Sequence, residues 1–319
     1  MSDKSRIEWT DATWNPVTGC TKVSDGCKHC YAERTWARLS APRAVPNRYT
    51  GRKFTDVQVH DDIIEQPLHW EKPRRIFVNS MSDLFHPSVP DIFIREIFAI
   101  MAVEAHHTFQ VLTKRPERMC ELLGMWRDDD VFMYHDGLAP SNVWLGVSVE
   151  DQATADERIP LLLDTPAAVR WVSAEPLLGP VRFHWDRWLP VSGFEQIERE
   201  RLRTIDWVVA GGESGPKARP MHPDWVRSLR DQCAEAVVPF LFKQWGEYCP
   251  SSYLPKDASL PARSWAWISE KGGPAEISLG GPFKAEFAHH ELMARIGKKS
   301  AGRLLDGIQH DSYPNEVPF

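Results

Sequence analysis

The run VWLGVSV, residues 143–149, decides the fold class. It is apolar almost without interruption and rich in β-branched and aromatic residues, as is typical of a strand buried on both faces of a parallel sheet. Similar runs centre on Val78, Val111, Leu145, Val172, Val208 and Leu241, at steps of 33, 34, 27, 36 and 33 residues. A further strand is expected ahead of these, near 13–18, although Pro16 lies inside it.

Helical segments lie between several of these runs. The stretches PDIFIREIFAIMAVEAH, DERIPLLLD and HPDWVRSLRDQCAEA have apolar residues at helical spacing. Strands and helices that alternate in this way form right-handed βα units. The sequence therefore predicts an α/β protein with a parallel βα barrel, complete or partial, of six or seven strands.

The barrel is expected to span residues 1–249, with a three-cysteine loop at 20–30 and a basic insertion at 34–74. Residues 250–319, rich at first in Pro, Gly and Ser, are expected to form a C-terminal cap with a short helix near 284–297.

The composition excludes several classes of protein. The chain has 319 residues, 42% of them hydrophobic, and a net charge of −6, which excludes a strongly basic protein that coats nucleic acid. Apolar runs stay well below the roughly 20 residues of a membrane span. The start, MSDKSRIEWTD, lacks the apolar stretch of a signal peptide. A cytoplasmic location is expected, where thiols stay reduced and clustered cysteines bind metal more often than they pair.

The stretch GCTKVSDGCKHCYAE, residues 19–33, brings Cys20, Cys27 and Cys30 within eleven residues. A C-x-x-C pair directs two sulfurs at one metal, and Cys20 supplies a third. Structural zinc takes four ligands, and the fourth here would be His29 or Cys249. A [4Fe–4S] cluster on three thiolates leaves one iron free for a small molecule. The pattern favours the cluster over zinc, because no second cysteine pair is present.

Charged residues follow nearly every predicted strand. Since the carboxyl ends of parallel strands meet at one edge, these side chains are expected to line one cavity above the metal centre. They are Asp83, Lys114, Glu150, Glu175, Glu213 and Lys243. The alternative is that strand ends reach solvent and carry charge for that reason alone.

The segments IEWTDATWNPVTGC, GCKHCYAER, VLTKRPER, SAEPLLGP, AGGESG, FKQWGE and GKKSAGRLLDG resemble a phage-associated family of largely unknown function. The three-cysteine loop after the first strand resembles the radical S-adenosylmethionine superfamily. The usual loop there is C-x3-C-x2-C, whereas the first gap here is six residues. The superfamily's GGE motif follows the second strand, whereas GGE here lies at 211–213, after a later strand.

The resemblance implies that the open iron binds the amino and carboxylate groups of S-adenosylmethionine. One-electron reduction by an external donor would then give a 5′-deoxyadenosyl radical. Asn79, Ser80 and Asp83 would stand in for the GGE motif, and His29 occupies the position of an aromatic residue before the last cysteine. Glu150 or Glu175 would accept hydrogen bonds from the ribose, and Lys114 would bind a carboxylate or phosphate.

The insertion begins with basic residues and no acid: Arg34, Arg38, Arg43, Arg48, Arg52 and Lys53. Trp36 and Tyr49 lie among them, and arginines with aromatic residues suit phosphate contact and base stacking. A DNA, RNA or nucleotide substrate is therefore predicted, to be modified or repaired. The alternatives are a radical enzyme that acts on a protein or small molecule, and a non-catalytic zinc-binding interaction protein.

Overall fold

The structure is a computed structural model that describes residues 5, 7–127, 139–185, 204–254, 264–273, 276–278 and 290–314. None of the helices in these ranges is long and apolar enough to cross a membrane.

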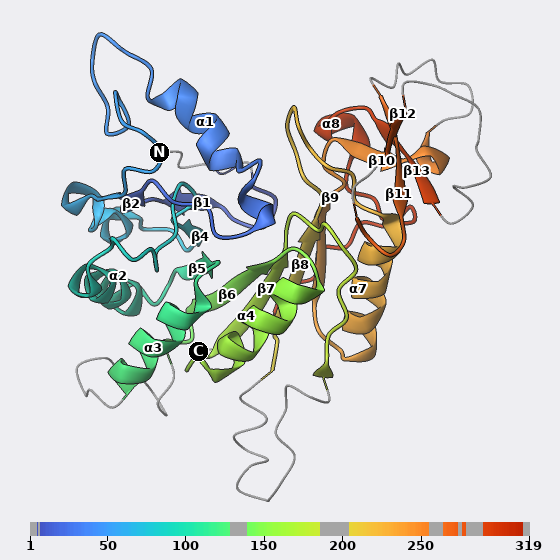
Figure 1. The fold of residues 1–319 in the computed structure, drawn as a ribbon. Coiled ribbons are helices and arrows are strands. Elements are labelled where there is room, and N and C mark those ends of the chain that lie inside the picture. The colour runs from blue at the N-terminus through green and yellow to red at the C-terminus, as the bar shows by residue number, and fades with distance from the viewer. Residues whose placement is uncertain are drawn as a thin grey trace, which may run out of the picture.

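Within the described residues, seven strands form one parallel sheet in the order β1-β4-β5-β6-β7-β8-β9. Their bounds are Ala12–Trp14, Arg75–Val78, Thr108–Thr113, Val143–Val149, Val169–Ala174, Trp207–Gly211 and Phe240–Gln244. Each neighbouring pair is parallel. The sheet curls into a partial barrel, which confirms the predicted fold class and the positions of the apolar runs (Figure 1).

The predicted first strand is divided in two. β1 ends at Trp14, and β2, Val17–Thr18, pairs antiparallel with β3, Gln58–Val59, in a separate sheet. Pro16 lies at the break and cannot donate a ladder hydrogen bond, which explains why the strand does not run through.

Helices cover the outer face of the sheet (Figure 1). They are α2 (Asp91–Val103), α3 (Pro116–Arg127), α4 (Gln152–Asp164) and α7 (Pro223–Glu235). Their apolar sides share one core cluster with the outward residues of the strands, such as Val111, Leu145 and Val208. The helices predicted for the stretches 90–106, 156–164 and 222–236 are confirmed.

The inner face changes character along each strand. Near the amino ends it carries a second cluster that includes Trp9, Trp171 and Trp207, which closes the bottom of the barrel. Gly146 makes room for this cluster, because a Cβ there would lie 2.5 Å from Cε2 of Trp171. Further along the same face β6 and β7 carry polar side chains: Ser148 lies four residues after Trp144, and Ser173 lies two residues after Trp171. Because successive side chains of a strand alternate between the two faces, the inner face carries the aromatic cluster near the amino ends and a polar cavity next to it.

The last strand of the barrel sheet is covered by the end of the chain. The amide of Phe242 donates to the carbonyl of His310 at 3.0 Å, and that of Ser312 donates to Phe240 at 3.2 Å. Such cover protects an edge strand from pairing with another chain.

The described part of the C-terminal region contains an antiparallel sheet in the order β10-β13-β11-β12. The strands are Tyr248–Pro250, His290–Arg295, Trp265–Ser269 and Glu276–Ser278, followed by α8, Lys298–Ala301. The expected helix near 284–297 is wrong over 290–295, where β13 pairs with both β10 and β11, and residues 284–289 lie outside the described ranges. The division at residue 250 stays a prediction.

Candidate metal and cofactor site

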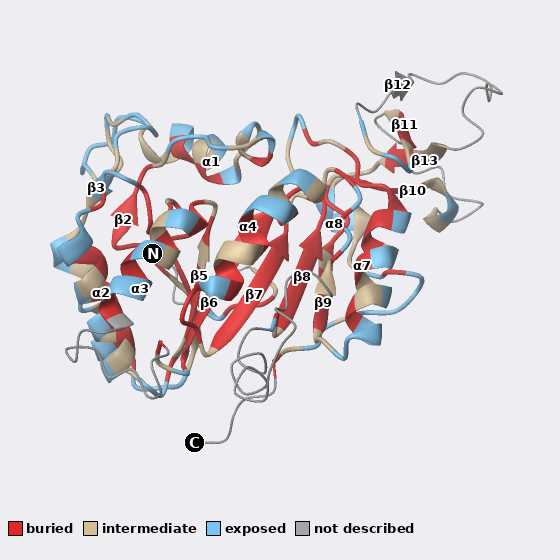
Figure 2. Cartoon of the chain, turned by 60° about the horizontal axis from the view of Figure 1, so that its bottom comes forward, coloured by how far each residue is buried: buried red, intermediate tan, exposed pale blue. Residues whose placement is uncertain are grey.

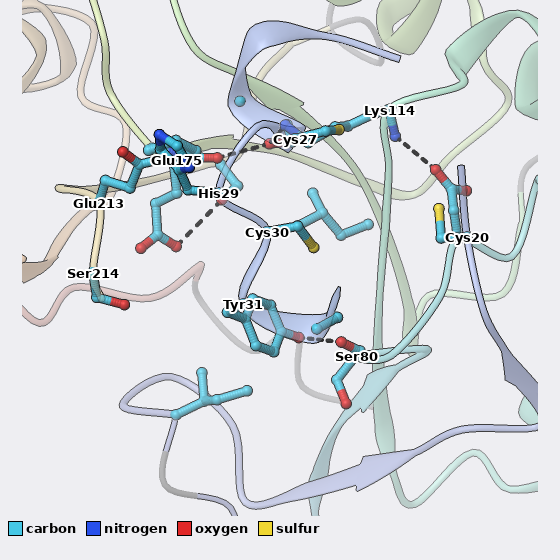
Figure 3. Close-up of a pocket in the computed structure, with 18 of the residues that line it drawn as sticks. Cys20, Cys27, His29, Cys30, Tyr31, Ser80, Lys114, Glu175, Glu213 and Ser214 are labelled. Carbon is cyan, nitrogen blue, oxygen red and sulfur yellow. Dashed lines mark hydrogen bonds between the residues drawn. The ribbon is translucent and has the colours of Figure 1, made fainter. Parts of the chain in front are cut away.

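A cavity of about 490 Å³ lies at the carboxyl edge of the barrel sheet. In Figure 2 the helix α1, Tyr31–Leu39, lies at the arrowhead end of the strands, where this cavity opens. The cavity is lined by all three cysteines of the loop and by residues that follow the strands. Of the predicted site residues it includes Cys20, Cys27, Cys30, His29, Arg34, Asn79, Ser80, Asp83, Lys114, Glu175, Glu213 and Lys243. Figure 3 labels Cys20, Cys27, Cys30, His29, Ser80, Lys114, Glu175 and Glu213.

The cysteine sulfurs form an open arrangement. Among the described residues, Cys20, Cys27 and Cys30 are not a group whose ligand atoms all lie within 4.8 Å of one another. Thiolates about 2.3 Å from one tetrahedral zinc ion would be about 3.8 Å apart. Binding of one zinc ion by all three cysteines would therefore require the sulfurs to move closer together.

Burial keeps the thiols of Cys20 and Cys30 protonated when no metal is bound. It raises the pKa of Cys20 to about 11 and also raises that of Cys30, while the amides of Glu33 and Ala32 at the start of α1 oppose the rise at Cys30. Metal binding therefore has to displace these protons. Cys249, the alternative fourth ligand, lies in β10 with 2% exposure, away from the cavity lining.

Arg115, the residue after Lys114, holds the start of the cysteine loop. Its guanidinium donates to Asp83 at 2.9 Å, to Thr21 at 2.9 and 3.0 Å, and to Cys20 Sγ at 3.6 Å. The remaining oxygen positions of Asp83 accept from the Thr113 hydroxyl at 2.7 Å and from backbone amides. Asp83 lines the cavity and also orients Arg115, so its predicted contact with a cofactor stays a prediction.

Glu150 holds the middle of the loop. It accepts from the Ser24 hydroxyl at 2.9 Å and forms ion pairs with Lys114 and with Arg158, the latter at 3.3 Å. Gly26 packs so closely against the Glu150 side chain that a Cβ would clash. Glu150 is absent from the cavity lining, with 1% of its side chain exposed, so its predicted place beside a ribose is not where the structure puts it.

Glu213 holds the loop from the other side through Arg219. Arg219 donates to both oxygens of Glu213, at 2.7 and 2.9 Å, and forms an ion pair with Asp25 between the cysteines. The glycines before Glu213 are structural as well, because Gly212 lies against the backbone of Trp245. The AGGESG turn thus helps to fix the loop through Glu213, and Gly212, Glu213 and Ser214 also line the cavity.

Glu175 and Lys243 face the cavity as a pair. The Lys243 ammonium lies 3.1 Å from both carboxylate oxygens of Glu175. The side chain of Lys243 is 17% exposed and that of Glu175 is 15% exposed. Gly211 makes this place available, since a Cβ there would lie 2.6 Å from Glu175 Oε1. Lys114 also reaches the cavity and donates to the Ser148 hydroxyl at 2.8 Å. These side chains remain the candidates for contact with a bound molecule.

The segment after β4, residues 79–80, contributes backbone groups and the side-chain amide of Asn79 to the site. Asn79 has a φ of 60° and accepts from the Val17 amide at 3.1 Å, while its Nδ2 has no hydrogen-bond partner among the described residues. The Ser80 hydroxyl donates to Asn15 at 3.0 Å, and its carbonyl accepts from the Tyr31 hydroxyl (Figure 3). The free Nδ2 leaves Asn79 with a donor beside the cavity.

Two arginines of the basic insertion form ion pairs with acidic residues of the same insertion. Arg48 pairs with Asp62 at 3.2 Å and Arg52 with Asp56 at 3.0 Å. The idea that Trp36 stacks a base is wrong, because its ring is 3% exposed and packs against Tyr49 and Phe54. Of the predicted nucleic-acid residues, the exposed ones are Arg34 and Arg38 on α1, Arg43 and Lys53.

The residues that sequence reasoning left out are those that hold the loop in place. Arg115 directly follows a predicted site residue at the end of a strand, so its position was a usable signal. Ser24 carries no signal, because Glu150 lies far away in sequence, and neither does the contact of Arg219 with Asp25.

The fold and the site together define a partial βα barrel with a three-cysteine cavity at the carboxyl edge of its strands. The chain belongs to the family described as "Protein of unknown function (DUF5131)", which it matches over residues 4–314. No curated protein matches the chain.

Several solved structures are similar to the chain at low identity. A cysteine-to-serine mutant of spore photoproduct lyase has 12% identity and a TM-score of 0.41, with 90% of this chain and 72% of that chain covered. A double mutant of that lyase with bound AdoMet and dinucleoside spore photoproduct gives the same values. The lyase complexed with dinucleoside spore photoproduct has 12% identity and a TM-score of 0.37, over 86% and 68% of the two chains. Similarity at this level does not establish an activity.

Proposed function

We propose that this chain is a radical S-adenosylmethionine-type enzyme in which Cys20, Cys27 and Cys30 hold a [4Fe–4S] cluster. The observation that carries the proposal is the convergence of three thiols on one cavity at the carboxyl edge of a parallel sheet. Within the described residues the cavity lining contains no fourth cysteine, and we propose that one iron is left open for S-adenosylmethionine. The donor set fits the cluster, because thiolates are its ligands.

The chain's own residues bind and orient the cofactor and the substrate and shield them from water. When bound, the cluster supplies one-electron reduction of S-adenosylmethionine. The volume of about 490 Å³ is that of a small-molecule site. Lys114 and Lys243 offer cations for a carboxylate, Glu175 offers acceptors for sugar hydroxyls, and Asn79 offers an amide donor. His29 lies beside the cysteines in the lining.

The proposed substrate is a nucleic acid or a nucleotide. Support comes from Arg34 and Arg38, four residues apart on α1 and both exposed, with Arg34 at the rim of the cavity. Arg43 and Lys53 add exposed cations in the same insertion. Arg48 and Arg52 belong to the predicted nucleic-acid set, but their ion pairs make them weaker candidates.

The substrate class is tested by binding of short DNA and RNA across a salt series. Each phosphate contact that is lost reduces the log–log slope by roughly one. An Arg38→Ala, Arg43→Ala, Lys53→Ala variant is expected to flatten the slope, and an Arg48→Ala variant, which removes a paired arginine, is expected to change it less. Salt-independent binding, or none, would move the proposal to a protein or small-molecule substrate.

The activity is tested by anaerobic reconstitution with iron and sulfide, followed by S-adenosylmethionine and dithionite. The expected product is 5′-deoxyadenosine, with absorbance near 400 nm in the reconstituted protein. Cys27→Ala is expected to lose both signals, and Cys120→Ala, which changes a cysteine outside the cavity, is expected to keep both. A colourless protein that holds one zinc ion after the same treatment would overturn the proposal.

A further inference from the structure

A second group of metal-type ligands lies at the opposite end of the barrel sheet from the cysteines. Glu104, His106 and His107 occupy the turn between the end of α2 and the start of β5. Among the described residues, they are the group whose ligand atoms all lie within 4.8 Å of one another. The side chains of Glu104 and His106 are 15% and 41% exposed, and His107 is 1% exposed.

His106 is oriented as a metal ligand is. Its Nε2 lies 3.0 Å from the carbonyl of Trp70, and since a carbonyl only accepts, this nitrogen carries the hydrogen. The neutral ring then directs the lone pair of Nδ1 at Oε2 of Glu104, 3.2 Å away. Two lone pairs that face each other need a cation between them, either a proton or a metal ion. Metal-bound histidines commonly donate their other N–H to a backbone carbonyl in this way.

His107 supplies a buried imidazole. The Pro67 backbone lies within hydrogen-bonding reach of the ring, which leaves at least one ring nitrogen without a hydrogen-bond partner among the described residues. A buried polar group without a partner costs about 1–3 kcal/mol, so such a group calls for an explanation. The ring lies against that of His106, with centroids 3.9 Å apart, and thus faces the same place.

The turn that carries these residues is held rigidly. Asn142, 5% exposed, donates to the carbonyls of Met101, Glu104 and His107 at 2.8, 3.3 and 3.1 Å. The backbone at Glu104 and His107 is therefore held before any ion arrives, which lowers the entropic cost of binding.

We propose that Glu104, His106 and His107 form a site for a divalent metal ion of the zinc type, independent of the cysteine cavity. Imidazole nitrogen and carboxylate oxygen are zinc ligands, and two of them about 2.1 Å from a tetrahedral ion are about 3.4 Å apart. The 3.2 Å between His106 and Glu104 is close to that spacing. Three protein ligands leave a fourth position, which opens to solvent beside the half-exposed ring of His106.

The test uses the full-length protein with Co²⁺ as an optical probe, because cobalt bound by cysteine shows thiolate charge-transfer bands and cobalt bound by histidine and glutamate does not. The comparison is made in a chain that carries Cys20→Ser, Cys27→Ser and Cys30→Ser. We expect one cobalt ion per chain without thiolate bands, displaced by Zn²⁺. Adding His106→Ala should weaken the affinity by more than about 100-fold, the upper end of the effect of outer-shell changes.

His69→Ala is the matched control, because it removes an exposed histidine from the neighbouring 3-10 helix Gln66–His69. It should leave cobalt binding unchanged. Equal binding by the His106→Ala and His69→Ala proteins would overturn the proposal, and so would a complete loss of binding when the cysteines are replaced. Circular dichroism of each variant shows that a loss of binding is not a loss of fold, since the ring of His106 is exposed.

Discussion

Removal of the Arg115 guanidinium by Arg115→Met tests the proposed anchoring of the cysteine loop. The side chains of Arg115 and Asp83 are 10% and 8% exposed, and their charged groups lie 2.9 Å apart. The change leaves a buried carboxylate without its cation and removes the hydrogen bonds to Thr21.

Breaking one partner out of a buried ion pair costs about 3–5 kcal/mol. Asp83 keeps its donors from Thr113, Phe85 and Lys114, so a loss of about 3 kcal/mol in the free energy of unfolding is expected. Replacing both charges, by Asp83→Asn with Arg115→Met, removes the unpaired carboxylate. The double variant should therefore be more stable than the sum of the single changes, by about 2 kcal/mol.

The measurement is urea unfolding of the metal-free protein, so that iron does not enter the comparison. Arg38→Met is the control, because it removes an exposed arginine from α1, and it should change stability by less than about 0.5 kcal/mol. A loss below about 1 kcal/mol for Arg115→Met, or strict additivity in the cycle, would refute the reasoning. Arg115→Met should also retain less iron, because the chain at Cys20 loses its hydrogen bonds to Arg115.

Gly146→Ala should cost about 1–3 kcal/mol in thermal unfolding, since the new Cβ meets the ring of Trp171, whereas Gly124→Ala in α3 meets nothing and should be neutral or stabilising. Burial lowers the pKa of His60 to about 4, so below about pH 6.5 the unfolded chain binds a proton that the folded chain refuses, and stability should fall with pH down to about 4. The slope stays well below about 1.4 kcal/mol per pH unit because the ring is only half-buried, and His60→Gln should flatten it; an unchanged slope would contradict this. Replacing any one of the three loop cysteines by Ala should abolish iron retention, measured by iron analysis after reconstitution, whereas Cys120→Ala should leave it intact.

Several features of the site could not be predicted from the sequence. A residue's position at the end of a strand does not determine which side chain it forms an ion pair or hydrogen bond with. Glu150 and Glu175 both follow strands, yet one is buried under the cysteine loop and the other pairs with Lys243 in the cavity. The difference depends on Ser24 and Gly26, which approach Glu150 from more than a hundred residues away.

Helix propensity also gave a wrong prediction where strand pairing in the folded protein was stronger. Residues 290–295, HELMAR, are good helix formers, but they form β13 because strands on both sides satisfy their backbone groups. Trp36 was placed among arginines by sequence, and the fold turns its ring inward against Tyr49 and Phe54.

The sequence by itself determined the parallel barrel and the shared location of the cysteines. Long apolar runs at a regular period can be buried only between helices, and the carboxyl ends of parallel strands then meet at one edge. The tertiary structure decided which charged residues hold the loop and which face the cavity. That choice depends on contacts such as Arg219 with Asp25, 194 residues apart, whose geometry exists only once the chain has folded.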